Sequence, residues 1–328
     1  MEHALKVPSK AEVILTAKEL LKMAIEDAEP LPSNGPDRHW NWRIRTKVQS
    51  FLIRIENPVA TAQRNTYIKD EIPIIKFFSA HNIAPTLIAG DAISGKTLVT
   101  EWIDAPQLPP QLADNQLKKL VKFLARINAI PYTASAQQLQ LMELFLDIPH
   151  LKKMAQNRLD MAKHMPEFQG AISELRPVLD RGFEKLEDDI SKIPQEIIFN
   201  PVLCYRDVGS TNFLETEPDY IAVDWEHHSV CVADPSFSLA VLSRRHQLSP
   251  AQESFVLQEY KKIADAPYLE ALIKARTLER ILVDESTWNL EWAIRRQNLP
   301  LENKEKAKAG AILQMQKKAT ELRALIGE

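Results

Sequence analysis

Two short stretches in the first third of the chain alternate between apolar and polar residues. Residues 39–46 place their apolar members on one side, and residues 50–55 read Ser-Phe-Leu-Ile-Arg-Ile, with Arg54 inside the run. Such alternation, rich in β-branched and aromatic residues, is typical of strands that pair with each other. A third run, Leu-Val-Thr-Glu-Trp-Ile, occupies residues 98–103. The pattern predicts a small antiparallel sheet.

Apolar residues at helical spacing dominate the rest of the chain. They predict helices over residues 10–27, 62–80, 117–127 and 148–193, and again from about residue 232 to the end. Pro73 must bend the second of these helices or mark its start, because proline has no backbone N–H to donate. A short strand-rich stretch, residues 197–232, interrupts the helical part.

A proline-marked stretch, residues 104–110, separates the predicted sheet from the helical part. We therefore predict an α+β fold with two lobes. The N-lobe, residues 1–103, would carry the sheet, and the mostly helical C-lobe, residues 104–328, would carry the strand-rich stretch. This layout is typical of proteins that hold a nucleotide between two lobes.

Composition excludes several classes of protein. The 328 residues are 45% apolar and 26% charged, with a formal net charge of -3. A sizeable core can therefore form, and neither disorder nor nucleic-acid binding is expected. We expect no membrane span, because no stretch of about 18 uncharged apolar residues occurs, and residues 1–13 lack the apolar run of a signal peptide. Two cysteines, Cys204 and Cys231, fit a reducing cytosol.

Three polar residues in the strand-rich stretch carry the chemical prediction. Asp207 and Asn212 lie five residues apart in a polar, turn-forming segment, and Asp224 ends a short apolar run. Phosphoryl transfer from ATP needs a carboxylate that orients the attacking hydroxyl and takes its proton. It also needs hard oxygen ligands that hold Mg²⁺ against the phosphates. One loop and the adjacent strand end could supply both.

The motifs resemble those of a known superfamily. Tyr-Arg-Asp at 205–207, then Asn212, then Val-Asp-Trp-Glu at 223–226 are similar to the catalytic and metal-binding loops of aminoglycoside phosphotransferases and choline kinases. Asp-Pro-Ser-Phe-Ser-Leu-Ala at 234–240 resembles the segment that follows those loops, with Ser238 where a second Asp is usual. The resemblance covers roughly residues 30–245. It implies a protein-kinase-like fold and a cytoplasmic enzyme that uses ATP and Mg²⁺ to phosphorylate a small-molecule alcohol.

The resemblance also implies roles for individual residues. Asp207 would be the catalytic base, and Asn212 and Asp224 would be the Mg²⁺ ligands. Arg54 would contact the α- and β-phosphates, and Glu71 would be its ion-pair partner.

Further residues would contact the nucleotide. Asn34 and Gly35 lie in a degenerate version of the family's glycine-rich nucleotide loop. Glu101, Trp102 and Ile103 fall where the hinge would hydrogen-bond adenine through its backbone.

Alternative interpretations stay open at this point. Arg54 and Glu71 could equally form a surface ion pair. The degenerate loop, Arg54 in place of the lysine of many kinases, and Ser238 are also consistent with a catalytically silent, nucleotide-binding scaffold.

The acceptor is not identified by the sequence. Trp288 and Trp292 share one face of a predicted helix, and the segment is similar to the Trp-Gly-Leu-Trp stretch of choline kinases. The two indoles could pack in the core. They could instead form an aromatic cage for a cation, with an acid such as Glu226, Glu291 or Asp284 balancing its charge. Choline-, ethanolamine-, thiamine- and aminoglycoside-like alcohols and sugar alcohols are all candidates.

Overall fold

The computed structural model describes residues 7–32, 38–59, 61, 66–91, 94–295 and 301–328. Internal contacts divide the chain into two compact units. The first unit comprises residues 1–143, 202–232 and 249–263, and the second comprises the remaining residues. The sequence-based boundary at residue 103 follows the last residues of strand β5, but the first unit extends beyond it. The boundary at 103 therefore stays a prediction.

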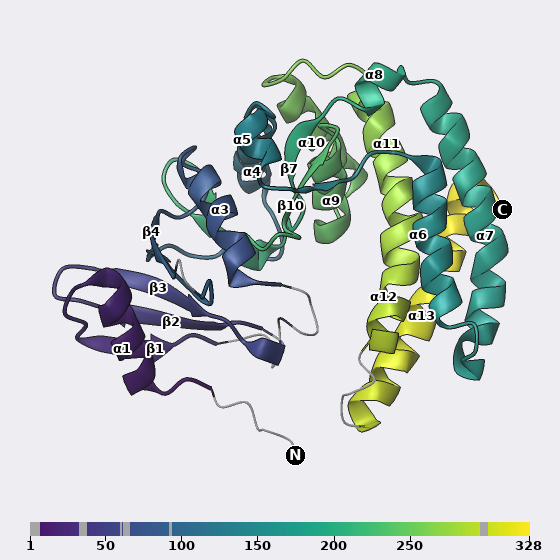
Figure 1. Ribbon diagram of the computed structural model, residues 1–328. Coiled ribbons are helices and arrows are strands. Elements are labelled where there is room, and N and C mark those ends of the chain that lie inside the picture. The colour runs from purple at the N-terminus through teal and green to yellow at the C-terminus, as the bar shows by residue number, and fades with distance from the viewer. Residues whose placement is uncertain (1–6, 33–37, 60, 62–65, 92–93, 296–300) are drawn as a thin grey trace. The chain divides into compact units, whose positions relative to one another are not determined.

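A five-stranded antiparallel sheet forms the start of the first unit (Figure 1). Its strands lie in the order β1-β2-β3-β5-β4. Their bounds are β1 Asp27–Pro30, β2 Trp40–Arg45, β3 Ser50–Ile55, β4 Leu87–Gly90 and β5 Thr97–Glu101. The two strands expected from alternation are present as β2 and β3, and the run expected at residues 98–103 is present as β5, which ends at Glu101. The sequence pattern missed β1 and β4, which lie at the two edges of the sheet.

The two faces of this sheet have different partners. Helix α1 (Lys10–Leu21) buries Val13 and Ala17 against a core that includes Trp42 and Ile53. In the register of β2, β3 and β5, Trp42 lies opposite Ile53, whereas the neighbouring Arg54 lies opposite Asn41 and Leu98. Because side chains alternate along a strand, Arg54 lies on the face opposite α1.

Two predicted helices differ at their ends from the structure. The helix expected over residues 10–27 ends at Leu21, because Lys22 adopts a left-handed conformation with φ 54° and caps the helix. The helix expected over residues 62–80 is observed as α3 (Ile68–Ser79), with Pro73 inside it. Pro73 lies in the second turn of α3, where its missing N–H removes one hydrogen bond.

The rest of the first unit surrounds the strand-rich stretch. It contains α4 (Asp114–Asn128), α5 (Ala134–Gln137), β6 (Met142–Glu143), β7 (Val202–Tyr205), β8 (Phe213–Glu215), β9 (Tyr220–Ala222), β10 (Val230–Ala233) and α10 (Pro250–Lys261). β6, β10 and β7 form one sheet, and β8 and β9 form a hairpin. Tyr205, Phe213 and Trp225 pack edge to face beneath the loops that join these strands. This aromatic cluster fixes the segment between β7 and β8.

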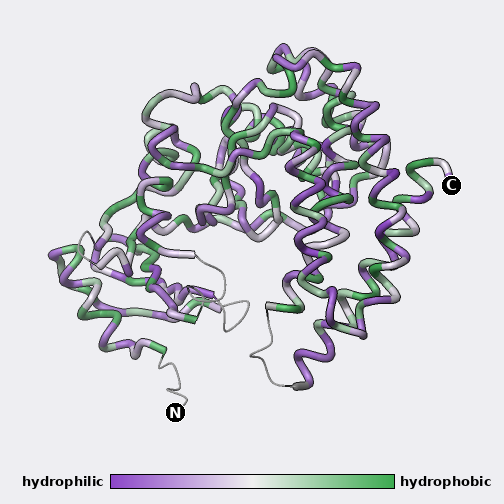
Figure 2. Tube along the Cα trace, turned by 45° about the vertical axis from the view of Figure 1, so that its right-hand side comes forward, coloured by the Kyte–Doolittle hydropathy of each residue, from purple (hydrophilic) through white to green (hydrophobic). Residues whose placement is uncertain are grey.

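The second unit is helical. Its helices are α6 (Ile148–Met161), α7 (Pro166–Ser191), α8 (Gln195–Ile198), α9 (Phe237–His246), α11 (Leu269–Arg280), the π-helical turn η2 (Ile281–Glu285), α12 (Ser286–Arg295) and α13 (Leu301–Ile326). Apolar and polar segments alternate along them in Figure 2, as expected for helices that share a core. Gly182 permits a close approach, because a Cβ there would lie 2.4 Å from Leu282.

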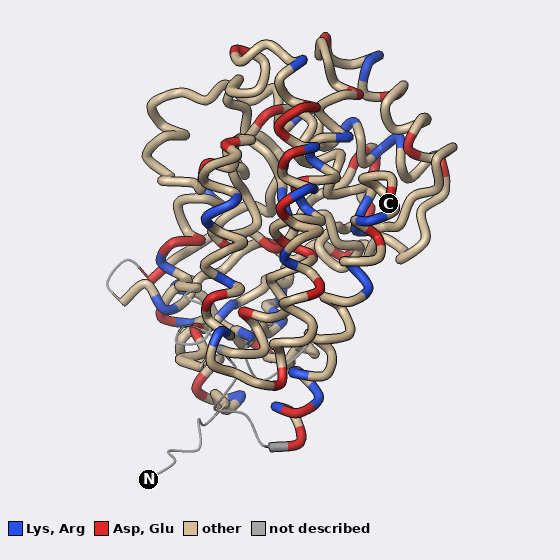
Figure 3. Tube along the Cα trace, turned by 90° about the vertical axis from the view of Figure 1, so that its right-hand side faces the viewer, with Lys and Arg blue, Asp and Glu red and all other residues tan. Residues whose placement is uncertain are grey.

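Charged residues of both signs are spread over the molecule, as the near-neutral net charge suggests (Figure 3). Figure 3 shows Lys and Arg interspersed with Asp and Glu along the helices. Among the described residues, no helix is long and apolar enough to cross a bilayer.

Candidate active site

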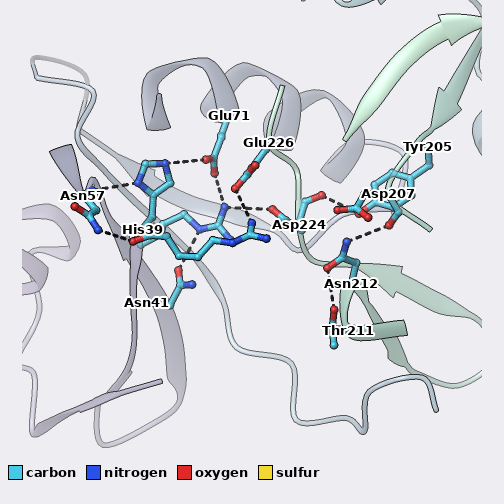
Figure 4. Close-up of polar contacts among 12 residues, drawn as sticks. His39, Asn41, Asn57, Glu71, Tyr205, Asp207, Thr211, Asn212, Asp224 and Glu226 are labelled. Carbon is cyan, nitrogen blue, oxygen red and sulfur yellow. Dashed lines mark hydrogen bonds and ion pairs between the residues drawn. The ribbon is translucent and has the colours of Figure 1, made fainter. Parts of the chain in front are cut away.

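Arg54 lies near the end of strand β3, and its guanidinium donates hydrogen bonds to Asn41 and Glu71. Its Nε donates to Oδ1 of Asn41, its cross-strand partner, at 3.1 Å. Its Nη1 donates to Oε2 of Glu71 on helix α3 at 2.7 Å (Figure 4). The side chains of Arg54 and Glu71 are only 12% and 1% exposed. The possibility of a surface ion pair is therefore wrong.

Glu71 lies in the first turn of α3 and also faces His39, which lies just before β2. Nε2 of His39 is 3.7 Å from Oε1 of Glu71, and the backbone N–H of Asn57 donates to Nδ1 of His39 at 3.1 Å. Burial raises the pKa of Glu71 to about 7, and nearby Asp224 and Glu226 add to the rise, while Arg54 opposes it. Arg54 therefore favours the ionised form of Glu71, whereas burial, Asp224 and Glu226 favour the protonated form.

The loop between β7 and β8 carries Asp207 and Asn212. A short 3₁₀ turn (η1, Ser210–Asn212) folds the loop back, and Nδ2 of Asn212 donates to the backbone C=O of Asp207 at 3.0 Å. The backbone N–H of Gly209 donates to the same carbonyl at 2.7 Å. These bonds fix the two predicted side chains on one turn (Figure 4).

Asp224 follows β9 and is tied to this loop through the backbone. The N–H of Val223 donates to the C=O of Asn212 at 2.9 Å, and the Tyr205 hydroxyl donates to the C=O of Asp224 at 2.8 Å. Oδ1 of Asp224 lies 3.6 Å from Nη1 of Arg54. The first unit thus contains Arg54, Glu71, Asp207, Asn212 and Asp224, and their roles at a nucleotide stay a prediction.

Glu226 adds a further negative charge. Its carboxylate is 8% exposed and lies 3.6 Å from the guanidinium of Arg38, which is 40% exposed. Burial alone would lower the pKa of Arg54, but the charges of Glu71, Asp224 and Glu226 raise it well above its ordinary value. One buried guanidinium among three carboxylates explains both shifts: the cation is favoured, and the carboxylate of Glu71 is disfavoured.

The donors fit a hard divalent cation. Oδ1 of Asp224 is buried and accepts no hydrogen bond from the described residues. Asn212 uses its amide nitrogen within the loop, and its Oδ1, which accepts from the Thr211 hydroxyl at 3.4 Å, is the atom of this side chain that could face a metal. No cluster of three or more His, Cys, Asp or Glu among the described residues could hold a metal by itself. Mg²⁺ commonly takes one or two protein oxygens and completes its shell with phosphates and water.

The predicted hinge follows β5. The carboxylate of Glu101 accepts the N–H and hydroxyl of Thr86 at 2.7 and 3.0 Å, so this side chain fastens β5 to the segment before β4. The guanidinium of Arg43 lies 4.5 Å from the ring centre of Trp102. Ile103 is partly buried. Asn34 and Gly35 lie outside the described residues.

Trp288 and Trp292 lie on α12 in the second unit. Their rings stack with centres 6.5 Å apart, and Trp288 is 46% exposed. The guanidinium of Arg158 lies 5.1 Å from the ring of Trp288, and its Nε donates to Glu291 at 2.8 Å. A cation of the protein itself therefore covers part of the aromatic surface predicted for a ligand.

Sequence reasoning missed three polar residues of the network: His39, Asn41 and Asn57. A signal was present only for Asn41, which lies between two tryptophans that share one side of an alternating strand. The pairing of Asn41 with Arg54 depends on strand register, and the contact between His39 and Asn57 joins residues 18 apart. Neither can be read from local pattern.

Solved structures share this fold. A choline kinase from Streptococcus pneumoniae has a TM-score of 0.65 at 15% identity over 95% of this chain and 98% of that one. A spectinomycin phosphotransferase in complex with ADP and spectinomycin has 0.65 at 16% over 95% and 99%. An ethanolamine kinase from Plasmodium vivax has 0.60 at 15% over 90% and 83%. At such identities the likeness shows the α+β, protein-kinase-like fold alone.

A search of the curated proteins gave no match. The model of the phosphotransferase enzyme family, in contrast, matches residues 30–272. This segment contains the antiparallel sheet, the loop of Asp207 and Asn212, and Asp224. With the fold and the polar residues in the expected order, the chain belongs to the phosphotransferase enzyme family.

Proposed function

We propose that this protein transfers the γ-phosphoryl group of ATP, with Mg²⁺, to a hydroxyl of a small molecule. The observation that carries the proposal is the network of Arg54, Glu71, Asp207, Asn212 and Asp224 within one compact unit. Phosphoryl transfer depends mainly on positioning and on compensating charge, and these residue types supply both.

Each residue has a distinct role in this proposal. The guanidinium of Arg54, oriented by Asn41 and Glu71, binds the α- and β-phosphates. The carboxylate of Asp207 orients the acceptor hydroxyl and takes its proton. Asn212 and Asp224 would hold Mg²⁺, which supplies charge compensation at the β- and γ-phosphates when bound.

The nucleotide base would meet the segment after β5. Backbone groups of Glu101, Trp102 and Ile103 would bond adenine, and the loop with Asn34 and Gly35 would cover the phosphates. The side chains of this segment are engaged elsewhere, because Glu101 bonds Thr86 and Trp102 stacks with Arg43. This supports contact through the backbone.

The acceptor is an alcohol of choline-, thiamine- or aminoglycoside-like class in this proposal. Proteins of the same fold are, by name, choline, ethanolamine and spectinomycin kinases or phosphotransferases. Glu226, in the same unit as Asp207, would balance a positive charge on the acceptor. A contact of Trp288 or Trp292 with the acceptor stays a prediction from the sequence. We further propose that the protein acts in the cytoplasm, without nucleic acid or membrane as partner.

A second candidate is a nucleotide-binding scaffold without activity. It is favoured by Ser238, which is fully buried with a hydroxyl that has no hydrogen-bond partner among the described residues. Ser238 thus carries no negative charge at the position where the family usually has an Asp.

Calorimetry with ATP and Mg²⁺, followed by a panel of alcohol acceptors, tests both candidates. We expect binding and turnover of at least one acceptor. Asp207→Asn should lower kcat by about 10²–10⁴-fold with little change in ATP affinity, and Asp224→Ala should weaken ATP·Mg²⁺ binding. Binding without turnover on the whole panel would favour the scaffold. Absence of ATP·Mg²⁺ binding would refute both.

A further inference from the structure

We propose that His39 is a positioning residue for the nucleotide phosphates: it holds Glu71 in the ionised state that orients Arg54. This inference rests on the proposed function, because Arg54 is the phosphate-binding group in it. Nothing in the sequence motifs points to His39, which lies just before β2 and is 4% exposed.

The tautomer of His39 follows from its partner. The backbone N–H of Asn57 can only donate, so Nδ1 of His39 must accept the bond of 3.1 Å between them. In the neutral ring the proton then lies on Nε2. Nε2 is the atom that faces Oε1 of Glu71, at 3.7 Å. His39 therefore directs an N–H toward the carboxylate.

Asn57 supports this arrangement through its backbone N–H and its side-chain amide. Its Nδ2 donates to the C=O of Arg38 at 2.8 Å, and its Oδ1 accepts the N–H of Val59 at 3.0 Å. The backbone carbonyl before His39 and the ring of His39 are thus both bonded to a single residue that follows β3. A ring held in this way has little freedom to turn away from Glu71.

The two oxygens of Glu71 have different partners as a result. Oε2 accepts from Arg54 at 2.7 Å, whereas Oε1 faces His39. A separation of 3.7 Å exceeds a hydrogen bond but permits an electrostatic contact, and such contacts often shorten when a substrate binds. A donor at Oε1 favours the carboxylate over the carboxylic acid.

This matters because the surroundings of Glu71 oppose its ionisation. Burial and the charges of Asp224 and Glu226 disfavour the carboxylate, and Arg54 favours it. Protonated Glu71 would lose its charge-assisted bond to Arg54. Arg54 would then turn toward Asp224, which lies 3.6 Å away. The N–H of His39 acts against this outcome.

Two conservative substitutions separate this role from a purely structural one. The amide nitrogen of Gln can occupy the place of Nε2, so His39→Gln keeps a donor toward Glu71. The amide of Asn reaches only as far as Nδ1, so His39→Asn keeps the contact with Asn57 and loses the donor. His39→Ala loses both, and His81→Gln, an exposed histidine of the same unit, is the control.

The measurements are the calorimetric Kd for ATP·Mg²⁺ and, on an acceptor from the panel, KM for ATP and kcat. We expect His39→Asn and His39→Ala to raise Kd and KM about tenfold, with kcat changed less than threefold. His39→Gln and His81→Gln should stay within threefold of the wild-type Kd. The rise in KM on acidification should begin at higher pH in His39→Asn, because the pKa of Glu71 rises when the donor is lost.

The opposite order of affinities would overturn the inference. If His39→Asn bound ATP·Mg²⁺ like the wild type and His39→Gln bound it weakly, the contact with Asn57 would be the one that matters. Equal affinity in all variants would overturn it too. Wild-type binding in the same experiment tests the proposed function separately, and its absence refutes both. Thermal unfolding is measured for each variant, and if His39→Ala does not fold, the comparison of Gln with Asn decides.

Discussion

Replacing Glu71 by Gln should change how the stability of the protein depends on pH. Burial raises the pKa of Glu71 from an ordinary value of 4.5 to about 7. Between these two values the folded protein binds more protons at this residue than the unfolded chain does. Stability that Glu71 contributes at low pH is therefore lost as the pH rises toward 7. The glutamine variant cannot titrate and should lack this loss.

The size of the effect follows from the two pKa values. One pKa unit corresponds to about 1.4 kcal/mol, so the rise from 4.5 to about 7 corresponds to about 3 kcal/mol. Urea unfolding of both proteins between pH 5 and pH 8 gives the free energy of unfolding at each pH. We expect the wild-type value minus the Glu71→Gln value to fall by about 2–3 kcal/mol up to pH 7 and to level off above it. Subtraction cancels the titrations that both proteins share.

A difference that rises with pH would refute this reasoning. It would mean that the attraction of Arg54, 2.7 Å away, exceeds the cost of burial and the repulsion from Asp224 and Glu226. A difference that does not change with pH would mean that Glu71 is not the residue whose ionisation is opposed.

Two further predictions concern the second unit. Arg276 is fully buried, with Nε 2.6 Å from Asp234. Arg276→Ala should therefore lower the free energy of unfolding in urea by about 3–5 kcal/mol, because the buried carboxylate of Asp234 loses its guanidinium partner; a cost below about 1 kcal/mol would contradict this. If Trp288 contacts a cationic acceptor, Trp288→Ala should raise KM for that acceptor more than tenfold, since such contacts contribute about 2 kcal/mol, and leave KM for ATP unchanged. An unchanged acceptor KM would exclude Trp288.

Strand β3, which carries Arg54, and its neighbour β2 could be predicted because the alternation of their apolar residues is local. β2 and β3 each present apolar residues to the core on every second position, and this period is visible in the sequence. Strand β5 was predicted from a run rich in β-forming residues. Strand β1 was missed because Asp27–Pro30 has no such period and exists through its pairing with β2. The preceding helix also ends earlier than its apolar pattern, since Lys22 closes it.

The site was predicted in part for the same reason. Asp207, Asn212 and Asp224 could be recognised because they lie in two short motifs. The burial of Glu71 could not, since a lone Glu and a lone Arg in a sequence equally suggest a surface pair. Its depth results from the packing of α3 against β4 and β5, which joins residues far apart in the chain. His39 was missed because a histidine at the start of a strand carries no signal of its partner.

The charged residues around Arg54 are close enough for the ionisation of each to influence the others. Glu71, Asp207, Asp224 and Glu226 bring four carboxylates to the same part of the first unit, and Arg38 and Arg54 bring two guanidiniums. With all six ionised, the formal charge is two minus four, or -2. The proposed Mg²⁺ has the charge that removes this excess, and a nearby cation lowers the pKa of a carboxylate. In this view metal binding at Asn212 and Asp224 favours the ionised Glu71, and Glu71 in turn fixes Arg54 for the phosphates. Before any ligand binds, the N–H of His39 already favours the ionised state of Glu71.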